Sequence, residues 1–287
     1  MKTRRAVFAG SWYPAGASDC EKEIRTFLAD KRFRVTPDKD YIGGIVPHAG
    51  WYFSGSLACN VIAAMQSANP QDAIDVIVVF GMHLAPDSPN VIMTDGAWET
   101  PFGDMAIATD MAMDLVEKYP FHVESSARFS QENTIELQLP FIKYFFPEAR
   151  ILPIGAPPTP DTLDLAEAVV DTANRSKLKI KIIGSTDLTH YGPNYGFAPA
   201  GRAEKGFDWV KDQNDRVIID RMMEMDPAGV IREGLSSQNA CCAGAAAAAI
   251  VASNAMGATS ARMVGYSSSY EKSPGDSFVG YVGLLYG

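Results

Sequence analysis

Short apolar runs rich in β-branched residues alternate along this chain with longer segments whose apolar residues recur at helical spacing. The runs typical of buried strands are 41–46, 74–80, 179–183, 262–266 and 278–285. The segments that predict helices are 18–31, 55–68, 110–118, 133–146, 160–174, 203–225 and 240–256. This alternation predicts an α/β fold with a central, mostly parallel or mixed sheet flanked by helices.

Two details refine this prediction. Pro140 lies inside the predicted 133–146 helix and must kink or shorten it, because proline has no N–H to donate. The run 278–285 is predicted to end the sheet, antiparallel to its neighbour. No repeat, linker or charge block divides the chain, so we expect one domain over residues 1–287.

Composition narrows the class of protein and of partner. The chain of 287 residues is 47% hydrophobic with a net charge of -9, which excludes a mainly disordered protein and argues against nucleic acid or an anionic membrane as partner. A small-molecule substrate remains open. The longest apolar stretch, 240–252, is too short to span a bilayer, and the start of the chain does not have the apolar run of a signal peptide. With no CxxC pair, a reducing, cytoplasmic location is expected.

The histidines carry the first functional signal. His48, His83 and His190 each follow a short apolar run, in a turn containing glycine or proline. In open α/β sheets, ligands bind outside the carboxyl ends of the strands, so these three side chains are predicted to converge. One histidine beside a strand is usually structural, but three in equivalent positions favour a metal or catalytic site. His122 lacks this setting and is expected to be structural or at the surface.

Two adjacent cysteines give the second signal. Cys241 and Cys242 stand at the start of a predicted helix rich in alanine, where the positive end of the helix dipole stabilises a thiolate. The alternative is that both are small core residues, and for Cys241 this interpretation is favoured.

Asp187 lies three residues before His190 and could orient its imidazole or tune its basicity. The alternative is that Ser185, Thr186 or Asp187 caps a helix. The sequence leaves both open.

Aromatic residues near the first histidine turn suggest a flat organic substrate. Trp51 and Tyr52 follow His48 closely, and Trp12 belongs to a second aromatic cluster, although aromatic side chains are equally common in cores. The chain contains no GxGxxG after a strand, no GxxxxGK[ST] and no GxSxG motif, so the usual nucleotide and serine-hydrolase signatures are missing.

Taken together, these segments resemble the Memo family, whose prokaryotic members are often called AmmeMemoRadiSam system protein B. The segments that carry the resemblance are 5–14, 47–51, 81–83, 185–192 and the helix start at Cys242. That family is similar in fold to the class III extradiol (LigB-type) ring-cleaving dioxygenases, which hold non-haem Fe(II) with two histidines and a carboxylate.

The resemblance implies a mononuclear metal bound by His48, His83 and Cys242, with Fe(II) as first choice and copper or zinc as alternatives. It also implies that His190 acts as acid and base beside Asp187, and that Trp12 stands at the pocket rim. A thiolate in place of a carboxylate changes the softness of the site, so ring cleavage is not simply inherited. The chain also departs from the family at Asn133, where many members have histidine.

The function expected first is therefore metal-dependent oxidation of a small aromatic or enediol-like substrate. One alternative is a metal-free hydrolase with Cys242 as nucleophile, His190 as base and Asp187 as orienting group. Another is a protein without enzymatic activity that binds a metal, a peptide or a partner protein in the same pocket.

Overall fold

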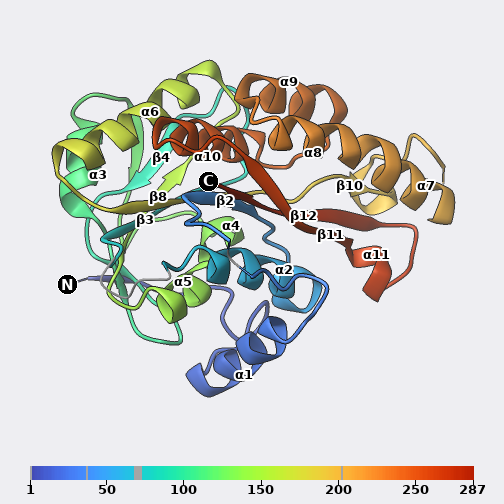
Figure 1. The fold of residues 1–287 in the computed structure, drawn as a ribbon, viewed down its shortest axis with the longest axis horizontal. Coiled ribbons are helices and arrows are strands. Elements are labelled where there is room, and N and C mark those ends of the chain that lie inside the picture. Colours follow the sequence, from blue (N-terminus) through green and yellow to red (C-terminus); the bar gives the residue numbers. More distant parts are fainter. Residues whose placement is uncertain (1, 37, 68–72, 202) are drawn as a thin grey trace.

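A large mixed sheet lies between two layers of helices (Figure 1). The computed structural model describes residues 2–36, 38–67, 73–201 and 203–287. The strand order is β10-β12-β2-β9-β3-β8-β4-β7, and β11 pairs with β12. The strands are β2 (Gly43–Val46), β3 (Val76–Gly81), β4 (Asn90–Met93), β7 (Phe121–Glu124), β8 (Arg150–Gly155), β9 (Ile180–Ser185), β10 (His190–Tyr191), β11 (Ala261–Ser268) and β12 (Phe278–Tyr286).

Four neighbouring strands at the centre of the sheet, β2, β9, β3 and β8, run parallel. Antiparallel pairs flank them, with β12 against β2 and β4 against β8. The predicted α/β class with a mixed sheet is confirmed, and so is the antiparallel final strand, but β12 does not end the sheet, because β10 and β11 pair with its other edge. The sequence did not reveal β8, because Pro153 stands opposite Val79 within a central strand, where proline is rarely found.

One face of the sheet is covered by α1 (Ala17–Leu28), α2 (Trp51–Ala64), α4 (Asn133–Glu136) and α5 (Leu139–Phe145) (Figure 1). Residues 133–145 form two short helices instead of one, and Pro140 sits in the first turn of α5, where no N–H is needed. The expected break in this segment is confirmed.

The other face is covered by α3 (Thr109–Val116), α6 (Pro160–Arg175) and α10 (Ala243–Ala255), with α8 (Asp215–Met223) and α9 (Pro227–Ser237) beside them (Figure 1). A wider π-helical turn at Val210–Asn214 joins α7 (Ala203–Trp209) to α8. The helix α9 was not predicted, although Asp226 accepts a hydrogen bond from the Gly229 N–H and the following proline is a common helix start. Within the described residues, no helix is both long and apolar enough to cross a membrane.

Helix α10 packs unusually close to the sheet because its inner face consists of alanines. A Cβ atom on Gly184 of β9 would lie 2.7 Å from Cβ of Ala249, which leaves no room for a larger residue on either side. This contact fixes the start of α10, and with it the two cysteines, near the end of β9.

A small separate sheet lies near the N-terminus and pairs β1 (Thr3–Arg4), β5 (Ala97–Trp98) and β6 (Met105–Ala106). A short helix, α11 (Ser269–Lys272), links β11 to β12.

Candidate metal centre

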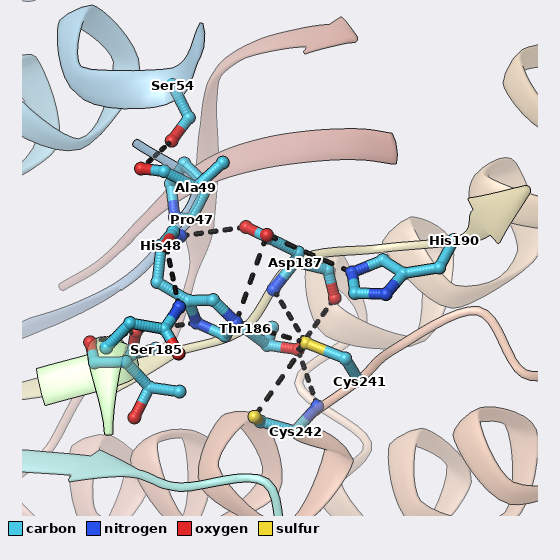
Figure 2. A network of polar contacts seen from close by, with 12 residues as sticks. Pro47, His48, Ala49, Ser54, Ser185, Thr186, Asp187, His190, Cys241 and Cys242 are labelled. Atoms are coloured by element: carbon cyan, nitrogen blue, oxygen red, sulfur yellow. Dashed lines mark hydrogen bonds and ion pairs between the residues drawn. The ribbon is translucent and has the colours of Figure 1, made fainter. Parts of the chain in front are cut away.

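The candidate site lies where three adjacent parallel strands end. Strands β2, β9 and β3 have their carboxyl ends at one edge of the sheet, and His48, Asp187 and His83 each follow two residues later. The start of α10 approaches the same edge and contributes Cys241 and Cys242 (Figure 2). The structure therefore brings the predicted residues together.

The imidazole of His48 is held in one orientation by a chain of hydrogen bonds. Its Nδ1 lies 3.0 Å from Oγ of Ser185, and that hydroxyl donates to the carbonyl of Thr134 at 2.7 Å. Because the Ser185 proton is used in this way, Oγ can only accept from Nδ1–H of His48. Nε2 therefore faces the site, in the arrangement usual for metal-binding histidines.

Asp187 lies beside both imidazoles. Its Oδ1 accepts the backbone N–H of His48 at 2.8 Å, while Oδ2 lies 3.9 Å from Nε2 of His48 and 4.0 Å from Nε2 of His190. The next helical segment begins only at Pro193, so capping by residues 185–187 does not occur. Of the two interpretations left open by the sequence, the geometry agrees with the orienting one.

His190 turns its ring toward Asp187, as Figure 2 shows. Its Nε2 is buried without a hydrogen-bond partner, which is rare for a polar atom and marks a group available to a ligand. Burial by itself lowers the pKa of His190, but the nearby Cys241 and Asp187 outweigh it and raise the pKa above the usual value.

The sulfur of Cys241 occupies the middle of the cluster (Figure 2). It lies 3.2 Å from Nε2 of His48, accepts the Asp187 N–H at 3.3 Å and is 3.8 Å from the sulfur of Cys242. Cys241, favoured as a core residue, does pack against the core, but its thiol also points at His48, because its backbone N–H is tied to the carbonyl of Asp187. Cys242 also lies in the cluster, with a side chain that is almost fully buried.

The two thiols differ in acidity. Burial favours the neutral form of Cys241, but its hydrogen bond with Cys242 and the charge of His48 hold its pKa well below the usual value. Burial and the neighbouring Cys241 raise the pKa of Cys242 well above its usual value. The pKa of His48 rises to about 9, because Asp187 and Cys241 outweigh the effect of burial.

His83 joins the cluster because the residue before it has a strained backbone conformation. Met82, just before it, has φ 70°, a left-handed conformation that is unfavourable for a non-glycine residue. The Met82 N–H is held at 2.7 Å by Oγ1 of Thr134. This turn places the His83 ring 4.9 Å from that of His48, and one nitrogen or sulfur atom from each of His48, His83, Cys241 and Cys242 lies within 4.8 Å of the others.

A cavity of about 570 Å³ opens above this cluster. Its lining includes His48, His83, Asp187 and His190, whereas neither cysteine contributes to it. Other residues that line it are Ser11, Trp12, Tyr52, Phe53, Asn133, Tyr195, Ser269, Ser273, Ser277, Val279 and Tyr281. The volume suits a small organic molecule.

Of the three aromatic residues predicted to contact substrate, two line this cavity. Trp12 is 40% exposed and Tyr52 is 66% exposed. The prediction for Trp51 is wrong, because its indole is buried, stacks on Phe141 with ring centres 4.1 Å apart and donates to the carbonyl of Leu137. It begins α2 and faces the core.

Residues 4–285 match the family described as Memo-like protein. The chain belongs to the Memo-like family. A MEMO1 family protein of Thermococcus onnurineus is 31% identical, covering 99% of both chains, and one of Methanopyrus kandleri is 32% identical, covering 99% of this chain and 98% of its own. An uncharacterized protein of Escherichia coli K12 shares the fold with a TM-score of 0.53 at 9% identity, over 85% of this chain and 99% of its own.

In this Memo-like protein, Asn133 stands at the cavity wall and donates from Nδ2 to the carbonyl of His48 at 3.0 Å. It thus supports the histidine loop. His122 lies exposed on β7, away from the site, as its sequence setting indicates. Sequence reasoning missed Ser185 as the partner of His48 and Tyr195, whose ring contacts His190.

Proposed function

We propose that this Memo-like protein binds one metal ion through His48, His83 and the thiolate of Cys241, in place of the Cys242 that the resemblance implies, and uses dioxygen to oxidise a small aromatic or enediol-like substrate in the cavity above. The observation that carries the proposal is the orientation of His48, whose Nε2 is directed at the Cys241 sulfur by Ser185 and Thr134. Nε2 and this sulfur lie 3.2 Å apart, and binding of a cation between them would release a proton, because metal ligands must be deprotonated.

The donor set fits a borderline or soft metal. Two imidazoles and a thiolate suit iron, copper or zinc, while magnesium and calcium prefer oxygen ligands. Fe(II) is our first choice, and copper and zinc are the rivals. When bound, such a metal supplies Lewis acidity and, for iron or copper, one-electron chemistry to a coordinated substrate oxygen.

The protein's own groups would position the substrate and move its proton. His190 lines the cavity and its Nε2 has no hydrogen-bond partner, so this nitrogen would accept a proton from a substrate hydroxyl, and Asp187 would stabilise the imidazolium that results. Trp12 and Tyr52 offer flat surfaces for a ring at the cavity mouth. Because a reactive thiolate is required, we place this activity in a reducing compartment, the cytoplasm.

Two other functions share the pocket. A cysteine hydrolase would need a sulfur that substrate can reach, but neither cysteine lines the cavity. A protein that binds a peptide or a partner protein at the exposed aromatic rim would turn over no substrate. Measurement of oxygen uptake distinguishes this function from the oxidase.

The test is metal analysis after purification without oxygen, with His48→Ala as the variant and His122→Ala as the matched control. We expect about one metal per chain in the wild type and in His122→Ala, and strong loss in His48→Ala, because His48 is a ligand. Equal and negligible metal in all three would refute the proposal.

Oxygen uptake with a panel of catechols and enediols, abolished in His190→Gln, would support the oxidase. Bound metal without turnover would favour a binding protein.

A further inference from the structure

The ring of His190 is placed mainly by the backbone that carries it. Its Nε2 has no hydrogen-bond partner, and Oδ2 of Asp187 lies 4.0 Å away. The ring also contacts that of Tyr195, with ring centres 4.9 Å apart. Neither contact is a hydrogen bond that would hold the imidazole in one direction. The position of His190 in the cavity therefore depends on what holds the residue before it.

That residue, Thr189, is fully buried and has each of its polar groups bonded. Its N–H donates to Oδ1 of Asp215 at 3.0 Å, and its hydroxyl donates to the same oxygen. Its carbonyl accepts the N–H of Gly280 at 3.1 Å, and its Oγ1 accepts Nδ2 of Asn214 at 2.9 Å. Strand β12 and the start of α8 thus hold Thr189 together.

Asp215 is itself fixed in place. It is fully buried at the start of α8, and its Oδ2 accepts the hydroxyl of Tyr266, on β11, at 2.8 Å. It packs so closely on β12 that a Cβ atom at Gly280 would lie 1.9 Å from Oδ2. The π-helical turn ends at the neighbouring Asn214, and such turns are rare and often found at functional sites. The carboxyl group therefore has a defined position relative to both strands.

We propose that Asp215 is a positioning residue for His190: by holding Thr189, it fixes the direction in which the next side chain enters the cavity. The proposal rests on the proposed function, in which His190 accepts a proton from the substrate. Thr189 needs an acceptor oxygen for its N–H and its hydroxyl, and an amide oxygen provides one as well as a carboxylate does. Misplacing a reacting group by about 1 Å can lower a rate about 100-fold, so this support matters for turnover.

Nuclear magnetic resonance in the presence of Zn²⁺, a diamagnetic ion, measures the position of the ring without any turnover. The wild type should show a nuclear Overhauser effect between the ring protons of His190 and Tyr195. Asp215→Ala removes the acceptor and should weaken this effect strongly, whereas Asp215→Asn keeps an acceptor oxygen and should retain it. Thr189→Val keeps the shape of the side chain without its hydroxyl and should also weaken the effect.

The matched control is Thr172→Val, in α6, which removes another buried hydroxyl that donates to a carboxylate, that of Asp114 at 3.1 Å. It should leave the effect unchanged. A full effect in Asp215→Ala and Thr189→Val, both shown to be folded by circular dichroism, would overturn the proposal. If Asp215→Ala does not fold, Thr189→Val decides alone.

Oxygen uptake with catechol gives a second readout. In Asp215→Ala and Thr189→Val, kcat should fall about 10- to 100-fold, while KM and metal content stay near the wild-type values. Metal content is expected to stay because the hydrogen bonds of both side chains go to groups other than the proposed ligands. An unchanged kcat, or an equal loss in Thr172→Val, would overturn the positioning role. Absence of turnover in the wild type would contradict the proposed function instead, and the ring position would still test Asp215.

Discussion

Two polar clusters in this protein, one buried and one partly open to solvent, differ in how closely their opposite charges approach. The first, called here the N-terminal cluster, consists of Arg4, Trp98, Glu124, Phe129 and Ser130. The second, the pocket floor, consists of His48, His83, Asp187, His190, Cys241 and Cys242. Both contain charged or ionisable groups taken out of water, which is costly unless they are paired.

In the N-terminal cluster the opposite charges are in direct contact, although Nε of Arg4 and Nε1 of Trp98 are buried without hydrogen-bond partners. Arg4 and Glu124 are 2.6 Å apart with side chains almost fully buried, and the guanidinium lies 3.6 Å from the ring centre of Trp98. In the pocket floor, by contrast, Asp187 stays about 4 Å from either imidazole. Removing one partner of a buried pair in contact is strongly destabilising, whereas charges left short of contact can bind a ligand.

The largest expected effect is therefore on stability, in the N-terminal cluster. Glu124→Ala leaves Arg4 buried without its partner and should lower the free energy of unfolding by about 3–5 kcal/mol. Metal content per folded chain should not change. Urea denaturation measures the first quantity, and metal analysis of the folded fraction measures the second.

The matched control is Glu148→Ala, which removes an exposed carboxylate and should change stability by less than about 0.5 kcal/mol. A loss in Glu124→Ala no larger than in this control would mean that the buried ion pair does not stabilise the fold.

The buried carboxyl group of Asp215 can be compared with that of Glu124, which has a cationic partner in Arg4. Asp215 accepts hydrogen bonds from the Thr189 N–H and from Tyr266, yet burial raises its pKa from 3.8 to about 7, and His190 opposes this only partly. The folded state therefore holds a proton that the unfolded state releases between these values. The resulting stability is fully present below pH 4 and is lost as pH rises through about 7, by up to about 4 kcal/mol.

Asp215→Asn tests the direction of this pH dependence of stability, because an amide does not titrate. Chemical denaturation at several pH values should show a smaller fall in stability from pH 4 to 7 than in the wild type. Parallel curves for the two proteins would mean that Asp215 is ionised throughout this range.

The sequence predicted that the candidate residues lie together because three histidines follow three strands, and parallel strands end at one edge. It could not separate Cys241 from Cys242, since adjacent residues at a helix start differ only in the direction their side chains take. It misplaced Trp51 for a similar reason: a residue beside the His48 turn can face the cavity or the core. Nor could it foresee Met82, because methionine gives no signal for the left-handed backbone that brings His83 into the site.

The smallest expected effect concerns the pocket floor itself. Asp187→Asn keeps an oxygen to accept the His48 N–H but removes the charge near both imidazoles. Metal affinity should fall about 10- to 100-fold, as for other groups that orient metal ligands, while the free energy of unfolding without metal changes by less than about 1 kcal/mol. Competition with a chelator and urea denaturation measure the two. The exposed Asp87→Asn serves as control and should alter neither. If Asp187→Asn instead destabilised the metal-free protein as strongly as Glu124→Ala, the pocket floor would be a second structural cluster, and its incomplete pairing would no longer indicate a binding site.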